Sequence, residues 1–138
     1  MEFKKWFDTL SRFCKEGSVE QMAKKLLPSE CKHLPLDKDL YFTAFCSDWN
    51  GYENDPTRPV IFLEAHMDTV QKEFIQPYLD SNKIHGTGLD NRVSCAILNK
   101  FVRNIGSSFN RTPGCTKCIL YFLWTDGEET GMVGINEW

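Results

Sequence analysis

Two short apolar runs, Val60–Ala65 and Cys118–Trp124, limit most tightly how this chain can fold. The second run is uninterrupted, and the first is broken only by Glu64. Apolar runs of this length are typical of strands that are covered on both faces. We therefore expect a sheet that is mostly buried, with Cys118–Trp124 as a central strand.

Two amphipathic helices are predicted at the start of the chain. Apolar residues recur at helical spacing over Phe3–Cys14, and Gly17 then ends the pattern. Ser18 and Gln21 are spaced as a capping box, which predicts the start of a second helix. Pro28 ends that helix, because proline cannot continue the hydrogen-bond ladder. The chain therefore begins with a helical pair.

The remaining segments alternate between strand, loop and helix patterns. We predict a strand for Leu40–Cys46, a loop for Ser47–Pro59 and a turn within the ambiguous segment Ile75–Lys83. A third helix is predicted from about Arg92 to Asn104, and its expected apolar face consists of Val93, Ala96, Ile97 and Phe101. This order predicts an α/β fold, specifically a three-layer α/β/α sandwich with a mostly buried mixed sheet.

Composition fits a globular domain better than a nucleic-acid or membrane protein. The chain has 138 residues, of which 41% are hydrophobic, so we expect a single domain over residues 1–138. The net charge is −3, and the basic residues are scattered along the sequence. No apolar run approaches the roughly 20 residues of a membrane span, and the N-terminus lacks the apolar core of a signal peptide. We expect a cytoplasmic protein.

The six cysteines are expected to be reduced thiols, because no secretory segment accompanies them. Core packing is the favoured role for Cys14, Cys46 and Cys95. Cys115 and Cys118 form a CxxC pair, and Cys31 with His33 would complete a Cys3His zinc site. The usual second CxxC pair is missing, so a chance pairing is favoured over a zinc site.

Three acidic segments carry the residues on which catalysis would depend. His66 and Asp68 follow the first apolar run, Asp90 lies between a glycine-rich turn and a helix start, and Glu128 and Glu129 follow the last apolar run. The segments are EAHMDTV (64–70), GTGLDNR (86–92) and TDGEETGMVG (125–134). Because ligands gather at the carboxyl ends of strands in open α/β sheets, we expect these five side chains to converge. Imidazole and carboxylate groups are ligands for zinc.

Each segment alone has a simpler explanation. A loop histidine near an aspartate is commonplace, and Asp90 is a suitable N-cap for the helix that follows it. Glu128 and Glu129 suit the first turn of a helix, where acidic side chains complement the helix dipole. The ordered set, with each member at the end of a strand or helix, favours a metal site over these separate explanations.

Together the three segments resemble the clan of co-catalytic zinc exopeptidases and deacylases, which includes aminopeptidases, tripeptidases, acylamino acid deacetylases and carboxypeptidases. The resemblance implies that His66 binds a first metal ion and that Asp68 orients the site. It implies that Asp90 bridges two ions and is often followed by a cis peptide. Glu128 would be the general base and Glu129 a ligand of the second ion.

The resemblance implies hydrolysis of peptide or acyl-amino acid amide bonds by water activated between two divalent ions roughly 3.5–4 Å apart. Zinc suits the ligands, and cobalt or manganese would also fit. The match extends over about Val60–Gly134 and does not decide between the aminopeptidase branch and the deacylase and tripeptidase branch.

Clan members carry a further acidic ligand and a second histidine later in the chain. We therefore expect the N-terminal part of a larger enzyme, completed by a further segment or by a second chain. His85 lies close to Asp90 and is a candidate replacement ligand, although a solvent-facing loop histidine is the simpler interpretation. Without the later strands of the clan, Cys118–Trp124 would lack one neighbour and leave an exposed sheet edge.

Two other functions stay open from the sequence. One is a non-catalytic remnant that keeps the fold as a binding or structural module, and the other is a monometal cyclase or deamidase. A cysteine hydrolase that uses Cys95 is weaker, because no second histidine lies beside it. The sequence does not identify the preferred substrate side chain or the oligomeric state.

Overall fold

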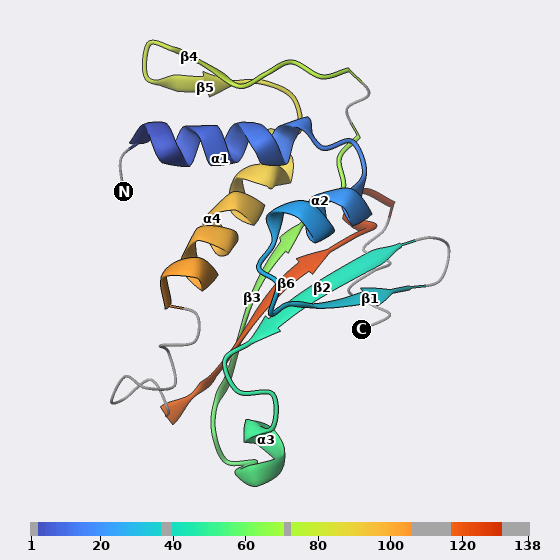
Figure 1. The fold of residues 1–138 in the computed structure, drawn as a ribbon, viewed down its shortest axis with the longest axis vertical. Coiled ribbons are helices and arrows are strands. Elements are labelled where there is room, and N and C mark those ends of the chain that lie inside the picture. Colours follow the sequence, from blue (N-terminus) through green and yellow to red (C-terminus); the bar gives the residue numbers. More distant parts are fainter. Residues whose placement is uncertain (1–2, 37–39, 71–72, 106–116, 131–138) are drawn as a thin grey trace.

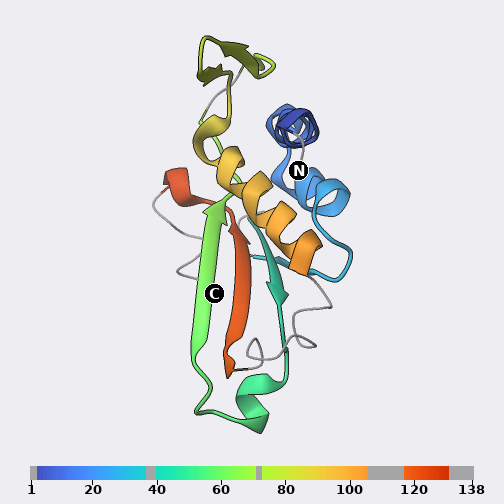
Figure 2. The ribbon, with the colours of Figure 1, turned by 90° about the vertical axis from the view of Figure 1, so that its left-hand side faces the viewer.

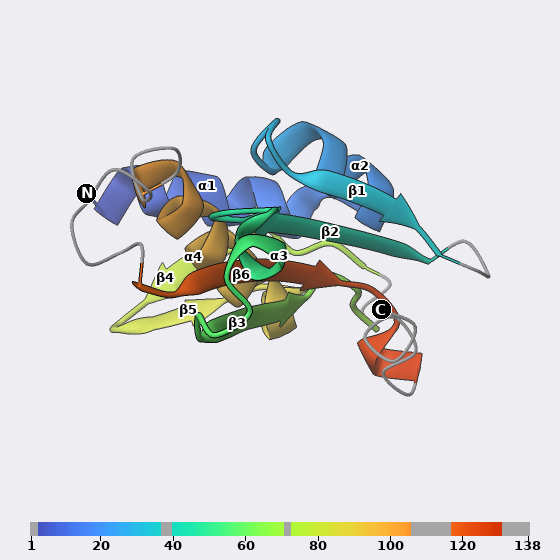
Figure 3. The ribbon, with the colours of Figure 1, turned by 90° about the horizontal axis from the view of Figure 1, so that it is seen from below.

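A four-stranded mixed sheet with helices on one face forms the body of the protein (Figures 1 and 2). The computed structural model describes residues 3–36, 40–70, 73–105 and 117–130. The strand order is β1 (Lys32–Pro35), β2 (Tyr41–Cys46), β6 (Ile119–Thr125) and β3 (Val60–His66), as Figure 3 shows from below. Strands β3 and β6 are parallel, and the other two pairings are antiparallel. These findings confirm the predicted α/β fold and mixed sheet.

Strand β6 occupies a central position, as its uninterrupted apolar sequence predicted. It lies between β2 and β3, and both β2 and β6 are largely buried. The outer strands β1 and β3 are largely exposed, although the last two residues of β3, Ala65 and His66, are buried. The expectation that the last apolar run leaves the exposed edge is wrong. That edge is β3, because β6 inserts between β2 and β3, and its exposed apolar side chains are Ile61, Phe62 and Leu63.

The helices α1 (Phe3–Lys15), α2 (Val19–Leu26) and α4 (Leu89–Ile105) cover the same face of the sheet (Figure 2). As predicted, Ser18 caps α2, and its hydroxyl oxygen accepts the backbone N–H of Gln21 at 3.3 Å. The main core lies between these helices and the sheet and includes Leu10, Phe13, Met22, Phe122 and Trp124. A smaller core on the opposite face contains Phe42, Ala44 and Leu123. Within the described ranges, the third layer of the expected sandwich is not seen.

The buried face of α4 differs from the predicted one. Ile97 and Phe101 are 44% and 54% exposed, whereas Arg92 and Asn99 are buried. The fully buried apolar positions of this face are Cys95, Ala96 and Val102. Of the predicted face, Ala96 is buried and Val93 packs against the core. The helix also buries Arg92, which donates to the carbonyl of Met67, and Asn99, whose Oδ1 accepts from Arg103 one turn later.

Two short elements lie in segments predicted as loop or turn. A single helical turn, α3 (Gly51–Asn54), interrupts the predicted loop. The strands β4 (Tyr78–Asp80) and β5 (Lys83–His85) form a separate hairpin, whose turn contains Ser81 at φ 47°. Both elements are shorter than the windows over which periodicity is informative. None of the helices within the described ranges combines the length and apolar character that crossing a bilayer requires.

Candidate metal centre

The parallel pairing of β3 and β6 brings two of the acidic segments to one end of the sheet. His66 is the last residue of β3 and pairs with Thr125, the last residue of β6. Gly127, at φ 79°, then turns the chain into the 3-10 helix η4 (Glu128–Thr130). This φ favours glycine, because a Cβ atom is strained there. The two strand ends therefore deliver their polar residues to the same rim.

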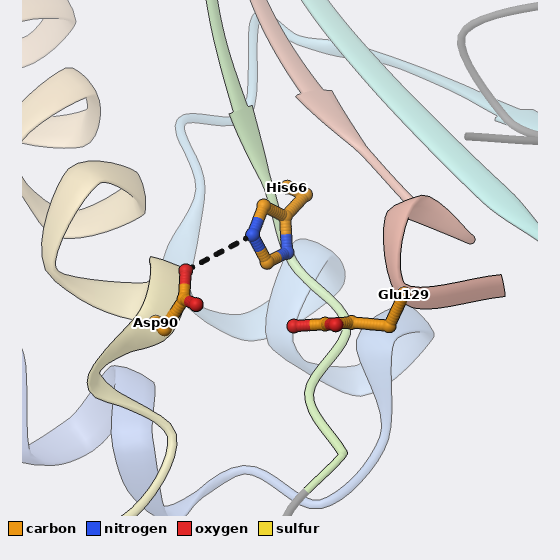
Figure 4. Close-up of side chains that lie close together, drawn as sticks. All are labelled: His66, Asp90 and Glu129. Atoms are coloured by element: carbon orange, nitrogen blue, oxygen red, sulfur yellow. Dashed lines mark hydrogen bonds and ion pairs between the residues drawn. The ribbon is translucent and has the colours of Figure 1, made fainter. Parts of the chain in front are cut away.

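The third segment reaches this rim through the start of α4. The backbone of Asp90 and Asn91 is not helical, so the regular helix begins at Arg92, as predicted. The peptide bond between Asp90 and Asn91 is cis, which agrees with the implication of the resemblance. The Asp90 side chain is 84% exposed and extends from this irregular turn toward the end of β3 (Figure 4).

Three of the predicted ligands, His66, Asp90 and Glu129, lie together at this rim (Figure 4). His66 Nε2 is 3.2 Å from Asp90 Oδ1. One ligand atom from each of the three residues lies within 4.8 Å of the others. Glu128 Oε2 is also near, 3.6 Å from His66 Nε2. The structure thus gathers residues from three separate parts of the chain around one point.

The carboxylate of Asp68 connects the segment after β3 to the start of η4. Oδ1 accepts the backbone N–H of Glu128 at 3.2 Å, and Oδ2 accepts that of Glu129 at 3.0 Å. The backbone oxygen of Asp68 lies 3.1 Å from His66 Nδ1. Because a carbonyl only accepts, Nδ1 carries the proton in this contact. Nε2 faces the Asp90 carboxylate, and a metal ion bound there would replace the proton that Nε2 donates to Asp90. Sequence reasoning expected Asp68 to orient the site but did not identify these backbone contacts.

The electrostatic surroundings of His66 favour a positive charge. Burial lowers its pKa, but the hydrogen bond to the Asp68 carbonyl and the nearby carboxylates of Asp68, Glu128 and Asp90 outweigh burial and raise the pKa above 6.5. Carboxylates that stabilise a protonated imidazole also stabilise a metal cation at the same place. The site is therefore suited to a cation.

Arg92 is a structural residue of the site that sequence reasoning missed. It is 1% exposed, and its Nε donates to the carbonyl of Met67 at 2.7 Å. Its Nη1 donates to the carbonyls of Phe13, at 2.6 Å, and Glu16. The available signal was the position of this arginine, two residues after Asp90 and three and four residues before Cys95 and Ala96, which share one helix face with it. Arg92 fastens the end of β3 to the end of α1.

Asp126 supports the turn between β6 and η4. Its carboxylate accepts the backbone N–H of Tyr41 at 3.0 Å and that of Gly127 at 2.8 Å. Burial raises the pKa of this carboxyl group. Asp126 therefore links the turn that carries Glu128 and Glu129 to strand β2, a role that was not predicted from the sequence.

Other candidate ligands lie elsewhere. His85 stacks on Tyr78 in the hairpin, with ring centroids 5.2 Å apart, and does not join the cluster. Among the described residues, Cys31, His33 and Cys118 do not gather into a metal-binding group, and Cys115 lies outside the described ranges.

Cys95 is packed into the core rather than exposed as a nucleophile. Its side chain is fully buried, and burial raises its pKa. Its Sγ lies 3.1 Å from the backbone oxygen of His66 and donates a hydrogen bond to it. A thiol without solvent access and with a raised pKa is a poor nucleophile. The geometry therefore argues against a cysteine hydrolase.

Comparison with known families gives one match. Residues 48–138 match the family model described as Peptidase family M28. The matched segment includes each of the site residues His66, Asp68, Asp90, Glu128 and Glu129. A comparison with curated proteins found no match.

Proposed function

This chain belongs to peptidase family M28, a family of zinc-dependent peptidases, and on that premise we propose that it hydrolyses peptide or acyl-amino acid amide bonds. The convergence of His66, Asp90 and Glu129 carries the proposal, because these residues come from distant parts of the sequence. An aminopeptidase-like action on the end of a peptide is the form that we favour.

The residues present fit a zinc ion. One imidazole nitrogen and two carboxylate oxygens are ligands that zinc prefers, at about 2.0–2.2 Å from the ion. Atoms bound to one such ion lie no more than about 4 Å apart, by doubling that bond length. The three ligand atoms already lie within 4.8 Å of one another, so only a small contraction is needed. We propose Asp90, whose side chain is 84% exposed, as the carboxylate that would contact a second ion in a two-ion site.

Bound zinc acidifies a water molecule and polarises the carbonyl of the substrate. In the proposed reaction, Glu128 accepts the proton of the attacking water. It then delivers the proton to the nitrogen of the leaving amine. Glu128 suits this role because its carboxylate lies beside the ligand cluster, 3.6 Å from His66 Nε2, and is partly exposed to solvent.

Asp68 is the proposed positioning residue for the general base Glu128 and for the metal ligand Glu129. By accepting both backbone N–H groups, it fixes the direction in which the two side chains leave η4. Its backbone carbonyl fixes the His66 ring at the same time. One residue thus sets the relative placement of the base and two ligands.

Hydrolysis by the zinc-loaded chain tests the proposal. We expect release of amino acids from aminoacyl 4-nitroanilides, and comparison with N-acetyl amino acids separates aminopeptidase from deacylase action. Glu128→Gln should lower kcat by about a hundredfold or more, because the base is lost. Its zinc content should equal that of the wild type, because Glu128 is not a proposed ligand.

Glu53→Gln is the matched control, since Glu53 is an exposed acid on α3, away from the rim. This variant should keep the wild-type rate. A Glu128→Gln variant that keeps the wild-type rate would exclude Glu128 as the base. Zinc loading without hydrolysis of either substrate would favour the non-catalytic binding module instead, and cyclisation of peptides with N-terminal glutamine would favour the monometal cyclase.

A further inference from the structure

A cationic cavity of about 260 Å³ lies between α1, α2 and α4. Its lining includes Lys5, Trp6, Arg12, Lys25, Lys100 and Arg103. None of the described residues that line it is acidic. The whole chain has more acidic than basic residues, 19 against 16. Five basic residues around one cavity therefore form a local concentration that the overall composition does not explain.

Most of these charges lack an acidic partner within the described ranges. Lys25 forms a salt bridge with Glu16 at 3.1 Å. Lys5, Arg12, Lys100 and Arg103 form no salt bridge with any described residue. Like charges that share a cavity repel one another, and a bound anion relieves this repulsion. The charge pattern therefore favours an anionic ligand with more than one negative charge.

Part of the cavity is already organised for such a ligand. Arg103 Nε donates to Asn99 Oδ1 at 3.1 Å, and Nη2 donates to the carbonyl of Leu26 at 2.9 Å. Asn99 is buried, so these bonds hold the guanidinium group in one orientation against a fixed wall. A guanidinium group held in place binds phosphate oxygens with little loss of side-chain entropy. Trp6 and the buried Phe13 provide an apolar wall beside the charges.

The geometry points to a binding site for a small phosphorylated compound in the cavity between α1, α2 and α4. The phosphate groups of this compound contact Arg12, Lys100 and Arg103. If the compound also has an organic part, that part packs against Trp6. Inorganic pyrophosphate and a nucleoside diphosphate share this phosphate chemistry.

This site is separate from the metal centre. Asp90 lies at the start of α4 and Arg103 near its end. The regular part of the helix separates them by about 17 Å, at about 1.5 Å per residue. None of the metal-site residues lines the cavity. Binding at the cavity therefore does not depend on the peptidase proposal.

Calorimetric titration of the full chain, stripped of metal with EDTA and then dialysed free of EDTA, tests the inference, since metal removal keeps phosphate away from the metal centre. We expect saturable binding of pyrophosphate or ADP. The double variant Arg12→Gln/Lys100→Gln should weaken this binding by about tenfold or more, because charge-assisted hydrogen bonds are lost. Arg12 and Lys100 lie on helix surfaces outside the fully buried core, so the double variant should keep the fold. ADP binding more tightly than pyrophosphate supports an organic phosphate, and equal binding supports the inorganic ion.

The control variant Lys4→Gln/Lys83→Gln removes the same net charge from positions outside the cavity. Its affinity should stay within about twofold of the wild type at physiological salt, because neither lysine lines the cavity and exposed charges are largely screened. Equal weakening in both double variants would overturn the inference, since it would show general charge attraction. Absence of saturable binding of both probes, or preference for a poly-glutamate peptide over either, would also overturn it.

Discussion

The side chain of Arg92 donates a 2.7 Å hydrogen bond to the carbonyl oxygen of Met67, the residue between His66 and Asp68. The same guanidinium group binds two carbonyls near the end of α1. The segment that carries the proposed histidine ligand is therefore fixed from inside the protein. The N-terminal helix and the metal centre are connected through one buried cation.

Arg92→Met should lower the free energy of unfolding by about 3 kcal/mol, because buried carbonyls lose their partner. Urea denaturation monitored by circular dichroism measures this loss. Arg12→Met is the control, since Arg12 is exposed, and its expected loss is below about 1 kcal/mol. Equal losses in the two variants would contradict the proposed role of Arg92.

Asp68→Asn should weaken zinc binding by about tenfold to a hundredfold, as substitutions next to metal ligands typically do. The amide has only one acceptor oxygen and so supports only one of the two backbone N–H groups of Glu128 and Glu129. Competition with a zinc chelator gives the affinity. Asp80→Asn in the β4–β5 hairpin is the control, and a similar effect there would rule out a specific role for Asp68.

Stability should fall as the solution becomes alkaline. Burial raises the pKa of Cys14 to about 11 and that of Cys31 to about 12, from 9.0. Above pH 9 the unfolded chain releases these protons while the folded chain keeps them, so unfolding becomes more favourable as pH rises through 9–12. Urea denaturation at a series of pH values measures this slope.

Cys31→Ala should make that slope shallower, because one of the shifted thiols is gone. Cys118→Ala is the control, since Cys118 is only partly buried. The prediction fails if the slope in Cys31→Ala equals that of the wild type.

Cys95→Ala should keep zinc-dependent hydrolysis within about threefold of the wild-type rate, because the thiol packs in the core and takes no part in proton transfer. Initial rates with aminoacyl 4-nitroanilides, with and without iodoacetamide, check this. A loss of activity as large as that of Glu128→Gln, in a variant that still folds, would support a cysteine nucleophile instead.

Local signals predicted several elements correctly. Gly17, Ser18 and Pro28 act through the backbone of their own neighbourhood, so the ends of α1 and α2 were readable from sequence. The apolar run of β6 identified its central place in the sheet. The buried face of α4 was only partly readable, because the burial of Arg92 depends on carbonyl groups that are far away in the sequence.

The candidate site was likewise only partly predictable from the sequence. His66, Asp90 and Glu129 were predicted to meet, because residues at the carboxyl ends of strands share one rim of an α/β sheet. The backbone contacts of Asp68 and Arg92 were not predicted, because they join residues far apart in the chain through carbonyl and N–H groups that every residue has.

Zinc binding by the purified chain tests the central claim most directly. Calorimetric titration should show saturable zinc binding that is lost in His66→Ala, Asp90→Asn and Glu129→Gln. It should be unchanged in Glu53→Gln, which removes an exposed acid elsewhere. Zinc binding of wild-type affinity and stoichiometry in all three site variants would contradict the claim that these residues form one metal centre.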